Sequence, residues 1–449
     1  MKASLNLSTD ENLVGRIEDD PIAQNLPERA TFIPLRQMDL RVKLAAEFTL
    51  EGRDLEHYKQ LCARLQAIFH VEHLSALLHL EELYDALDPD SQLIDLDAID
   101  PWQREHQTDK LLDRFTGLLY SAHYKRLTHD ELKRAIEIGC QWGVQLVVDF
   151  DLFDRLEIFA RGYQTVVVSR RRWRNFFRKE TIELPEFQRL IMAFRMKPEP
   201  EAPSSNKKKS DASLDHRFVY LKTFKNIPEN DLEILLPGSK VRLTKLDRAR
   251  ILLPTLSGMA ITIYKVARGV LVLSLVFTLD HLWGWTILIG ASVGYIIKSF
   301  LSYLRTKNKY QFGLTASLYL KNLDNNSSVI YRILNEAEEQ ELCEAILAYT
   351  FLWKHPEVPA KGLTGPELDE IIEAYLFHVT GVDVDFEVHD GLGKLARLGL
   401  AEVDSHGHWT VSKIEEATGY LTRNWNALFE ARARAVASGE TLKDDLFTG

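Results

Sequence analysis

The feature that most limits what this chain can fold into is a long apolar stretch at residues 251–303. The run His281–Ile297 is 17 residues long and carries no formal charge when His281 is neutral. About 17 residues is the shortest length that spans a bilayer as a helix. The preceding run, Ile251–Leu279, is longer and contains two charged residues. Because a polar turn at Asp280 separates the two runs, the pattern predicts a hairpin of two transmembrane helices.

Small residues and flanking charges refine this expectation. Gly290 and Gly294 form a GxxxG pattern, which lets the second helix pack closely against the first. Lys and Arg residues flank both ends of the stretch, so both ends are expected on the cytoplasmic side and the Asp280 turn on the far side. Two alternatives stay open: a hairpin buried inside a soluble domain, and a shallow hairpin held in one leaflet.

Periodicity divides the chain before this stretch into regions. Residues 1–34 form an N-terminal tail, and apolar residues that recur every three or four positions predict helices over residues 35–140. Apolar and polar residues alternate at Val144–Ala160, which predicts a β-hairpin. Further strand-like runs follow, so residues 141–250 are expected to form an α+β domain with an antiparallel sheet. A Pro-, Ser- and Lys-rich stretch predicts a mobile loop at residues 198–216.

The C-terminal region at residues 336–449 shows the order helix, helix, helix, β-hairpin, helix, which is typical of a winged helix-turn-helix. Thr364 and Glu367 have the spacing of a capping box at the start of its second helix. Residues 338–449 carry nine Lys and Arg against 21 Asp and Glu, a net charge of −12. DNA phosphates repel such a surface, so DNA is not an expected partner, and a protein contact through the winged helix is favoured.

A basic segment with aromatic residues is the sharpest charge feature of the sequence. Six cations fall within the ten residues from Arg170 to Lys179. Such a cluster can bind anionic lipid headgroups, be a solvated basic face, or bind nucleic acid. Beside a predicted membrane hairpin, lipid is the favoured partner. The candidate lipid-contact residues are Arg170, Arg171, Arg172, Trp173, Arg174, Arg178 and Lys179.

Acidic residues and histidines give weaker candidates for metal or acid chemistry. Asp149, Asp151 and Asp154 follow a Val-rich strand, as acids in phosphoryl-transfer sites do, but the alternation places the first two on the polar face. His70 and His73 have the i, i+3 spacing of helical metal ligands, without a third ligand fixed by the sequence. Three cysteines without CxxC spacing favour neither a zinc module nor a disulfide framework. No nucleotide-binding or hydrolase motif occurs, so no catalytic residue, metal or cofactor is predicted.

Several longer motifs together resemble a known family. They are FIPLRQMDL, VDFDLFDRLEIFARG, FKNIPENDLEILLPGSKVRLTKLDRARILLP, SLYLKNLDNN and EAEEQELCEAILAYTFL. In these motifs the chain resembles the transmembrane protein 143 family, which is defined by a domain of unknown function. The resemblance implies two transmembrane helices and no assigned reaction. Animal members of this family are mitochondrial, whereas this N-terminus has no presequence pattern, so the bacterial inner membrane is the expected location.

These observations lead to one expectation and two alternatives. We expect an α+β protein with a two-helix transmembrane hairpin, a helical N-terminal region, an antiparallel sheet domain and a C-terminal winged helix-turn-helix. Its cytoplasmic domains are expected to act by protein and lipid contact, as a non-enzymatic anchor, sensor or assembly factor that could form a homo-oligomer. The alternatives are a membrane-bound enzyme with a site near Asp149, Asp151 and Arg161, and a membrane-tethered transcription regulator.

Overall fold

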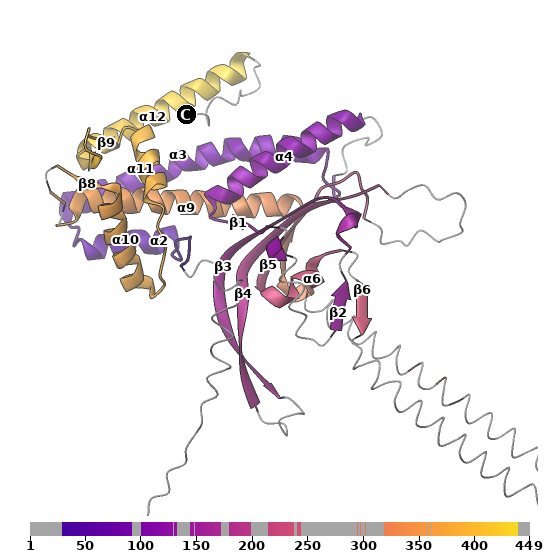
Figure 1. Cartoon of the computed structure of the whole chain (residues 1–449). Coiled ribbons are helices and arrows are strands. Elements are labelled where there is room, and N and C mark those ends of the chain that lie inside the picture. Colours follow the sequence, from indigo (N-terminus) through magenta and orange to yellow (C-terminus); the bar gives the residue numbers. More distant parts are fainter. Residues whose placement is uncertain are drawn as a thin grey trace, which may run out of the picture. The chain divides into compact units, whose positions relative to one another are not determined.

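The structure is a computed structural model, and its parts are shown in Figure 1. It describes residues 29–91, 100–128, 130–132, 144–147, 149–171, 179–198, 214–237, 240–243, 294, 297, 301, 318–356, 358–359 and 361–438. The chain forms two compact units. The first comprises Met1–Leu127, Phe153–Lys225 and Leu323–Gly449, and the second comprises Thr128–Leu152 and Asn226–Asn322. Three regions that differ in sequence pattern, the N-terminal helices, the long strands and the acidic C-terminal region, therefore contribute to one unit.

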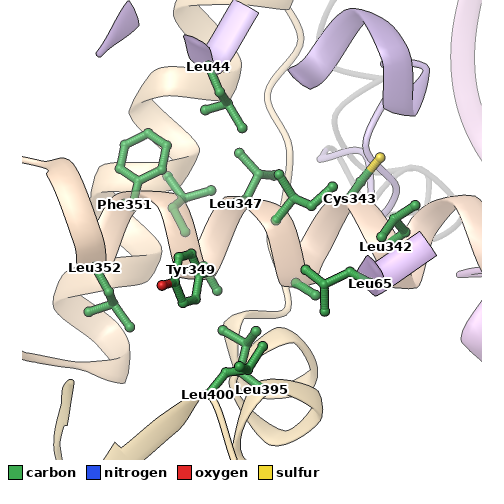
Figure 2. Close-up of a cluster of buried hydrophobic side chains, with 14 of the residues drawn as sticks. Leu44, Leu65, Leu342, Cys343, Leu347, Tyr349, Phe351, Leu352, Leu395 and Leu400 are labelled. Carbon is green, nitrogen blue, oxygen red and sulfur yellow. The ribbon is translucent and has the colours of Figure 1, made fainter. Parts of the chain in front are cut away.

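Helix α9, at Ser327–Lys354, is the central element of the first unit. Every residue from Leu342 to Leu352 is buried, and a helix that is apolar on all sides is stable only when it is surrounded by protein. The helices around it are α2 (Gln37–Glu47), α3 (Gly52–Asp85), α10 (Gly365–Thr380) and α11 (Val388–Arg397). Figure 2 shows Leu347 and Phe351 of α9 on the side of this helix where Leu44 of α2 lies, and Leu395 of α11 on the opposite side.

The main sheet of the first unit has the strand order β1-β3-β4-β5-β7. Its strands are β1 (Lys125–Arg126), β3 (Phe153–Arg171), β4 (Lys179–Met196), β5 (Tyr220–Pro228) and β7 (Asn322–Asn325). Strands β3 and β4 form a long antiparallel pair that ends at Arg171 opposite Lys179, and its far end extends beyond the other strands (Figure 1). A second core packs Phe159 and Ile191 of this pair against α3, α4 (Pro101–Ser121) and α9.

The C-terminal part of the first unit runs in the order α9, β8, α10, α11, β9, β10, α12. The short strands β8 (Leu363–Thr364), β9 (Ala401–Val403) and β10 (His408–Val411) form a sheet of order β8-β10-β9. Helix α12 follows at Ile414–Ser438. The capping box at Thr364 and Glu367 is present, and Gly381 ends α10 with a left-handed φ of 69°. This order of helices and strands is the one that the sequence predicted for a winged helix-turn-helix, and we call α9 to α12 the winged-helix segment. In that prediction α11 takes the place of the helix that reads DNA in DNA-binding members.

The second unit contains a small antiparallel pair. Strand β2 (Val144–Val147) pairs with β6 (Lys240–Leu243), from Val144 opposite Leu243 to Val147 opposite Lys240. The short helices of this unit are η2 (Phe150–Leu152), η4 (Glu229–Asp231) and α6 (Leu232–Leu235).

The hairpin predicted at Val144–Ala160 is wrong in its pairing, although both halves contain strands. Strand β2 pairs with β6, and β3 pairs with β4. The backbone N–H of Asp151 donates to the Asp149 carboxylate in the intervening turn, which continues as a 3-10 helix and not as a two-residue hairpin turn. Alternation of apolar and polar residues identifies a strand but carries no information about its partner.

The predicted fold class is confirmed for its α+β character and wrong for the transmembrane hairpin. In the described part of the chain, no helix is both long enough and apolar enough to cross a membrane. Most of residues 251–303, including Gly290, lies outside the described residues. The residues that Gly294 would pack against also lie outside the described part of the chain, so the GxxxG packing stays a prediction. A hydropathic stretch shows that its side chains favour an environment without water, but it does not distinguish a lipid bilayer from a protein interior.

Candidate functional site

A row of three carboxylates lies along one edge of α9. Glu338, Glu341 and Glu344 are spaced three residues apart, so they follow one another along the helix surface. Two histidines of α3 face the first two: His70 Nδ1 lies 3.1 Å from Glu338 Oε2, and His73 Nε2 lies 3.7 Å from Glu341 Oε2. We call these three glutamates the α9 ladder. It joins α3 to α9 by polar contacts along the edge of an otherwise apolar interface.

Glu344, the innermost member of the ladder, is held from two sides. Its side chain is only 2% exposed, and one carboxylate oxygen forms a short hydrogen bond with Nε2 of buried His123. The Lys394 ammonium of α11 donates to the other oxygen at 2.7 Å. A Cβ added to Gly391 would lie 3.0 Å from the Glu344 carbonyl oxygen, so glycine at this position lets α11 approach α9 closely.

The electrostatics of this buried group favour its ionised form. Burial raises the pKa of Glu344, but the charge of Lys394 and the hydrogen bond from His123 outweigh this effect and hold the pKa below its ordinary value. Burial lowers the pKa of the Lys394 ammonium, and the charges of Glu344 and Glu341 reverse that shift and raise it. The pair is therefore ionised at neutral pH, and each charge depends on the other.

The second cation of α11 is also held by a carboxylate. Arg397 forms a bidentate contact with Glu72 of α3, with nitrogen–oxygen distances of 2.8 and 2.9 Å. Lys394 is held by Glu344, so both cations of α11 are engaged by residues of its own unit. Glu387, the residue before the helix, and Asp390 in its first turn are exposed. The surface that would face a DNA groove therefore presents carboxylates.

A second polar cluster surrounds Arg161 on β3. Its side chain is 10% exposed, and the guanidinium pairs with Glu336 at 2.7 Å and donates to the Ala122 carbonyl oxygen at 3.0 Å. The guanidinium carbon also lies 5.0 Å from the ring centre of Phe32 and 4.8 Å from that of Tyr124. The Tyr124 hydroxyl donates to Glu336 at 2.8 Å, and burial raises the pKa of that hydroxyl. Arg161 thus joins the sheet to α9 and to the N-terminal segment.

A hollow of about 390 Å³ lies beside this cluster. Its walls are Ala30, residues 32–36, residues 161–163 and Gln188 of the β3–β4 pair, Glu339 and Gln340 of α9, and residues 382–383. None of Asp149, Asp151 and Asp154 is among these lining residues. The enzyme alternative predicted that such acids converge with Arg161 in one pocket, and this hollow does not bring them together.

The sequence-predicted acids occupy separate local contacts. Asp149 and Asp151 are exposed, and the Asp149 carboxylate accepts a hydrogen bond from the Asp151 backbone. Asp154 forms an ion pair with Arg195, which also pairs with Glu105. Among the residues that the structure describes, no group of three or more His, Cys, Asp and Glu side chains could hold a metal ion.

Three of the predicted lipid-contact residues, Arg170, Arg171 and Lys179, lie at the far end of the β3–β4 pair. The backbones of Arg170 and Arg171 end β3, and Lys179 begins β4 opposite Arg171. Arg172, Trp173, Arg174 and Arg178 lie outside the described residues. The lipid contact stays a prediction.

Sequence reasoning missed the buried partners of the α9 ladder. It selected His70 and His73 by their spacing, whereas the structure places both opposite carboxylates of α9. A usable signal for the deepest group exists: Glu344 is the only charged residue between Cys343 and Trp353, in a helix segment that is otherwise apolar or neutral. A charge in such a segment is buried only when a partner neutralises it.

The structure defines an α+β protein in which ion pairs of α11 hold this helix against α9 and α3. A family model described as a protein of unknown function, DUF3754, matches residues 187–328. This match covers less than half of the chain and supports a domain of unknown function without an assigned reaction. No solved structure matches the chain. The resemblance to the transmembrane protein 143 family stays a prediction.

Proposed function

We propose that this chain acts by binding other proteins, with the winged-helix segment as the contact module, and not by reading DNA or catalysing a reaction. The observation that carries the proposal is the engagement of both α11 cations. Lys394 is bound to Glu344 and Arg397 to Glu72, so neither is available to a phosphate. Exposed Glu387 and Asp390 would meet the phosphates instead.

The charge of the whole segment supports the same proposal. Residues 338–449 have a net charge of −12, and Lys and Arg contacts with phosphates supply most of the affinity of non-specific DNA binding. An acidic surface of this kind attracts basic partner surfaces and increases the rate of association with them. The tethered transcription regulator is therefore the less favoured function.

The test is DNA binding by the whole chain, measured by fluorescence anisotropy with a short random duplex at about 100 mM salt. We expect no binding by the wild-type chain. The matched variant carries Glu387→Lys and Asp390→Lys, which should add salt-dependent DNA binding because it reverses the charge of the surface beside α11. Tight, salt-dependent binding by the wild-type chain would refute the proposal and favour the regulator.

A second proposed contact is with anionic lipid headgroups, through the basic segment between Arg170 and Lys179. The strand register supports it, because Arg170, Arg171 and Lys179 come together at the end of the β3–β4 pair. The location that fits this contact is the surface of an anionic membrane, such as the bacterial inner membrane.

Each Lys or Arg near an anionic leaflet contributes about 1 kcal/mol. Replacing Arg170, Arg171, Arg172 and Arg174 by Gln should therefore greatly reduce flotation of the whole chain with anionic liposomes. Neutral liposomes are the control. Equal flotation with neutral and anionic liposomes would contradict the lipid contact.

A further inference from the structure

The described chain begins with a short irregular segment that precedes α2. Residues 29–36, which we call the N-terminal strap, pair with the loop between α10 and α11. The Ala30 backbone N–H donates to the Asp383 carbonyl oxygen at 2.8 Å, and the Asp385 N–H donates to the Ala30 carbonyl oxygen at 2.7 Å. Ala30 and Val384 thereby form a parallel β-bridge. The contact reproduces on a small scale the way in which peptides add a strand to a protein surface.

The side chain of Arg29, one residue before this bridge, lies among three carboxylates. Arg29 Nε donates to Asp383 Oδ1 at 2.9 Å, and a terminal nitrogen lies 2.6 Å from Glu373 Oε2 and donates to the Val384 carbonyl oxygen at 2.7 Å. The other terminal nitrogen lies 3.5 Å from Asp385 Oδ1. We call the three carboxylates and this carbonyl oxygen the acidic notch. It engages all three nitrogens of the guanidinium, which a lysine ammonium cannot reproduce.

The acidic notch carries more negative charge than Arg29 neutralises. Asp369 of α10 lies near it as a fourth carboxylate, and its buried Oδ1 has no hydrogen-bond partner among the described residues. Burial raises the pKa of Asp369 to about 6, and the charges of Glu373 and Asp385 add to this shift. Three carboxylates thus contact one guanidinium and a fourth lies near them, so the site retains an attraction for further positive charge.

The rest of the strap is anchored independently of the notch. The Gln340 side chain accepts from the Ile33 N–H at 2.8 Å and donates to the Ile33 carbonyl oxygen at 3.2 Å. Phe32 stacks on the Arg161 guanidinium. At the other end, the side chains of Asp383 and Asp385 are 63% and 53% exposed. Arg29 can therefore leave the notch while the strap stays bound at Ile33.

We propose that the acidic notch is a docking site for an arginine presented on an extended segment of a partner protein, and that Arg29 occupies this site in cis. The proposal rests on the proposed function as a protein-binding chain, and it names the chemistry of the partner. The partner segment carries an arginine followed by a small residue, so that its backbone can bridge Val384 as Ala30 does. It binds by displacing Arg29 and Ala30.

The experiment uses the whole chain and a labelled peptide with the sequence of residues 29–35, RATFIPL. The Arg29→Ala chain keeps the Ala30 backbone but lacks the guanidinium that competes for the acidic notch, so it should bind the peptide about 10-fold more tightly than the wild-type chain does. A peptide with Ala in place of its arginine should lose that gain, and a peptide with Lys should recover only part of it. In the Arg29→Ala background, Asp383→Asn with Asp385→Asn should weaken binding of the arginine peptide about 10-fold.

A second measurement does not depend on binding affinity. Hydrogen exchange at the Asp385 amide should be faster in the Arg29→Ala chain than in the wild-type chain, and the arginine peptide, but not the alanine peptide, should restore protection. Equal affinity of the two peptides, or of the two chains, would overturn the proposal. So would a wild-type dimer that the peptide dissociates, because the occupant would then be a second copy. If the arginine peptide does not bind the Arg29→Ala chain and the wild-type chain does not bind DNA, the docking site is refuted and the proposed function stands.

Discussion

Replacing Glu344 by Gln tests whether the buried ion pair holds α11 on α9. The glutamine keeps the shape of the side chain and can still hydrogen bond with His123, but it removes the charge that neutralises Lys394. Removing one partner of a buried ion pair lowers stability by about 3–5 kcal/mol. The Lys394 side chain is 17% exposed and its ammonium lies 4.0 Å from a Glu341 carboxylate oxygen, so Lys394 keeps some compensation. We therefore expect Glu344→Gln to lower the free energy of unfolding by about 3 kcal/mol, the low end of this range.

A double variant separates the ion pair from general damage to the core. Glu344→Gln with Lys394→Met removes both charges, so no unpaired charge stays buried, and the loss should be smaller than the sum of the two single losses by about 2 kcal/mol. Glu402→Gln, at an exposed position of β9, is the matched control and should change stability by less than about 0.5 kcal/mol.

Urea unfolding of the whole chain, followed by circular dichroism, measures these differences through the shift of the midpoint at constant slope. Because the folded state lowers the pKa of Glu344, its stabilisation is present above the pKa of the unfolded group, about 4.3, and is lost as the pH falls through the folded value. The gap between wild type and Glu344→Gln should therefore close in acid. A loss below about 1 kcal/mol at pH 7, or single losses that simply add, would refute the reasoning.

Two further predictions concern the same region. The folded state raises the pKa of Asp369 to about 6, so ionisation of this carboxyl lowers the free energy of unfolding as the pH rises from about 4 to 6. Asp369→Asn should therefore raise the melting temperature at pH 7, and this gain should vanish below about pH 4. A Cβ at Gly391 would crowd the Glu344 carbonyl oxygen at 3.0 Å, so Gly391→Ala should lower the urea midpoint by the equivalent of about 1–3 kcal/mol, and an unchanged midpoint would contradict the close contact of α11 with α9.

Local features of the fold were predictable where their cause is local. The capping box needs only Thr364 and Glu367, two residues within one turn of the chain, and it is present as expected. Strand pairing is not local. The partner of β2 begins at Lys240, whereas the strand that follows it at once, β3, pairs with β4. The alternation of β2 is compatible with either pairing, so the sequence pattern alone favoured the nearer and wrong partner.

The site was less predictable because its contacts join distant segments. His123 and Glu344 are 221 residues apart, and no spacing rule connects them. The i, i+3 spacing of His70 and His73 was visible, but the same spacing serves a metal site or a row of contacts with a facing helix. Only the position of α9 decides between them, because it brings Glu338 and Glu341 to the two imidazoles.

The acidic composition of the C-terminal region predicted that it would repel DNA, and the structure supplies a stronger reason. Lys394 and Arg397 are the cations that a DNA-reading α11 would need, and each holds α11 against another helix through Glu344 or Glu72. Freeing them requires removal of those carboxylates, and for Glu344 this means burying an unpaired Lys394. The stability of the winged-helix segment and DNA binding by α11 would therefore require the same two side chains, Lys394 and Arg397. A change that added DNA binding through these cations would loosen the contact that keeps α11 in place.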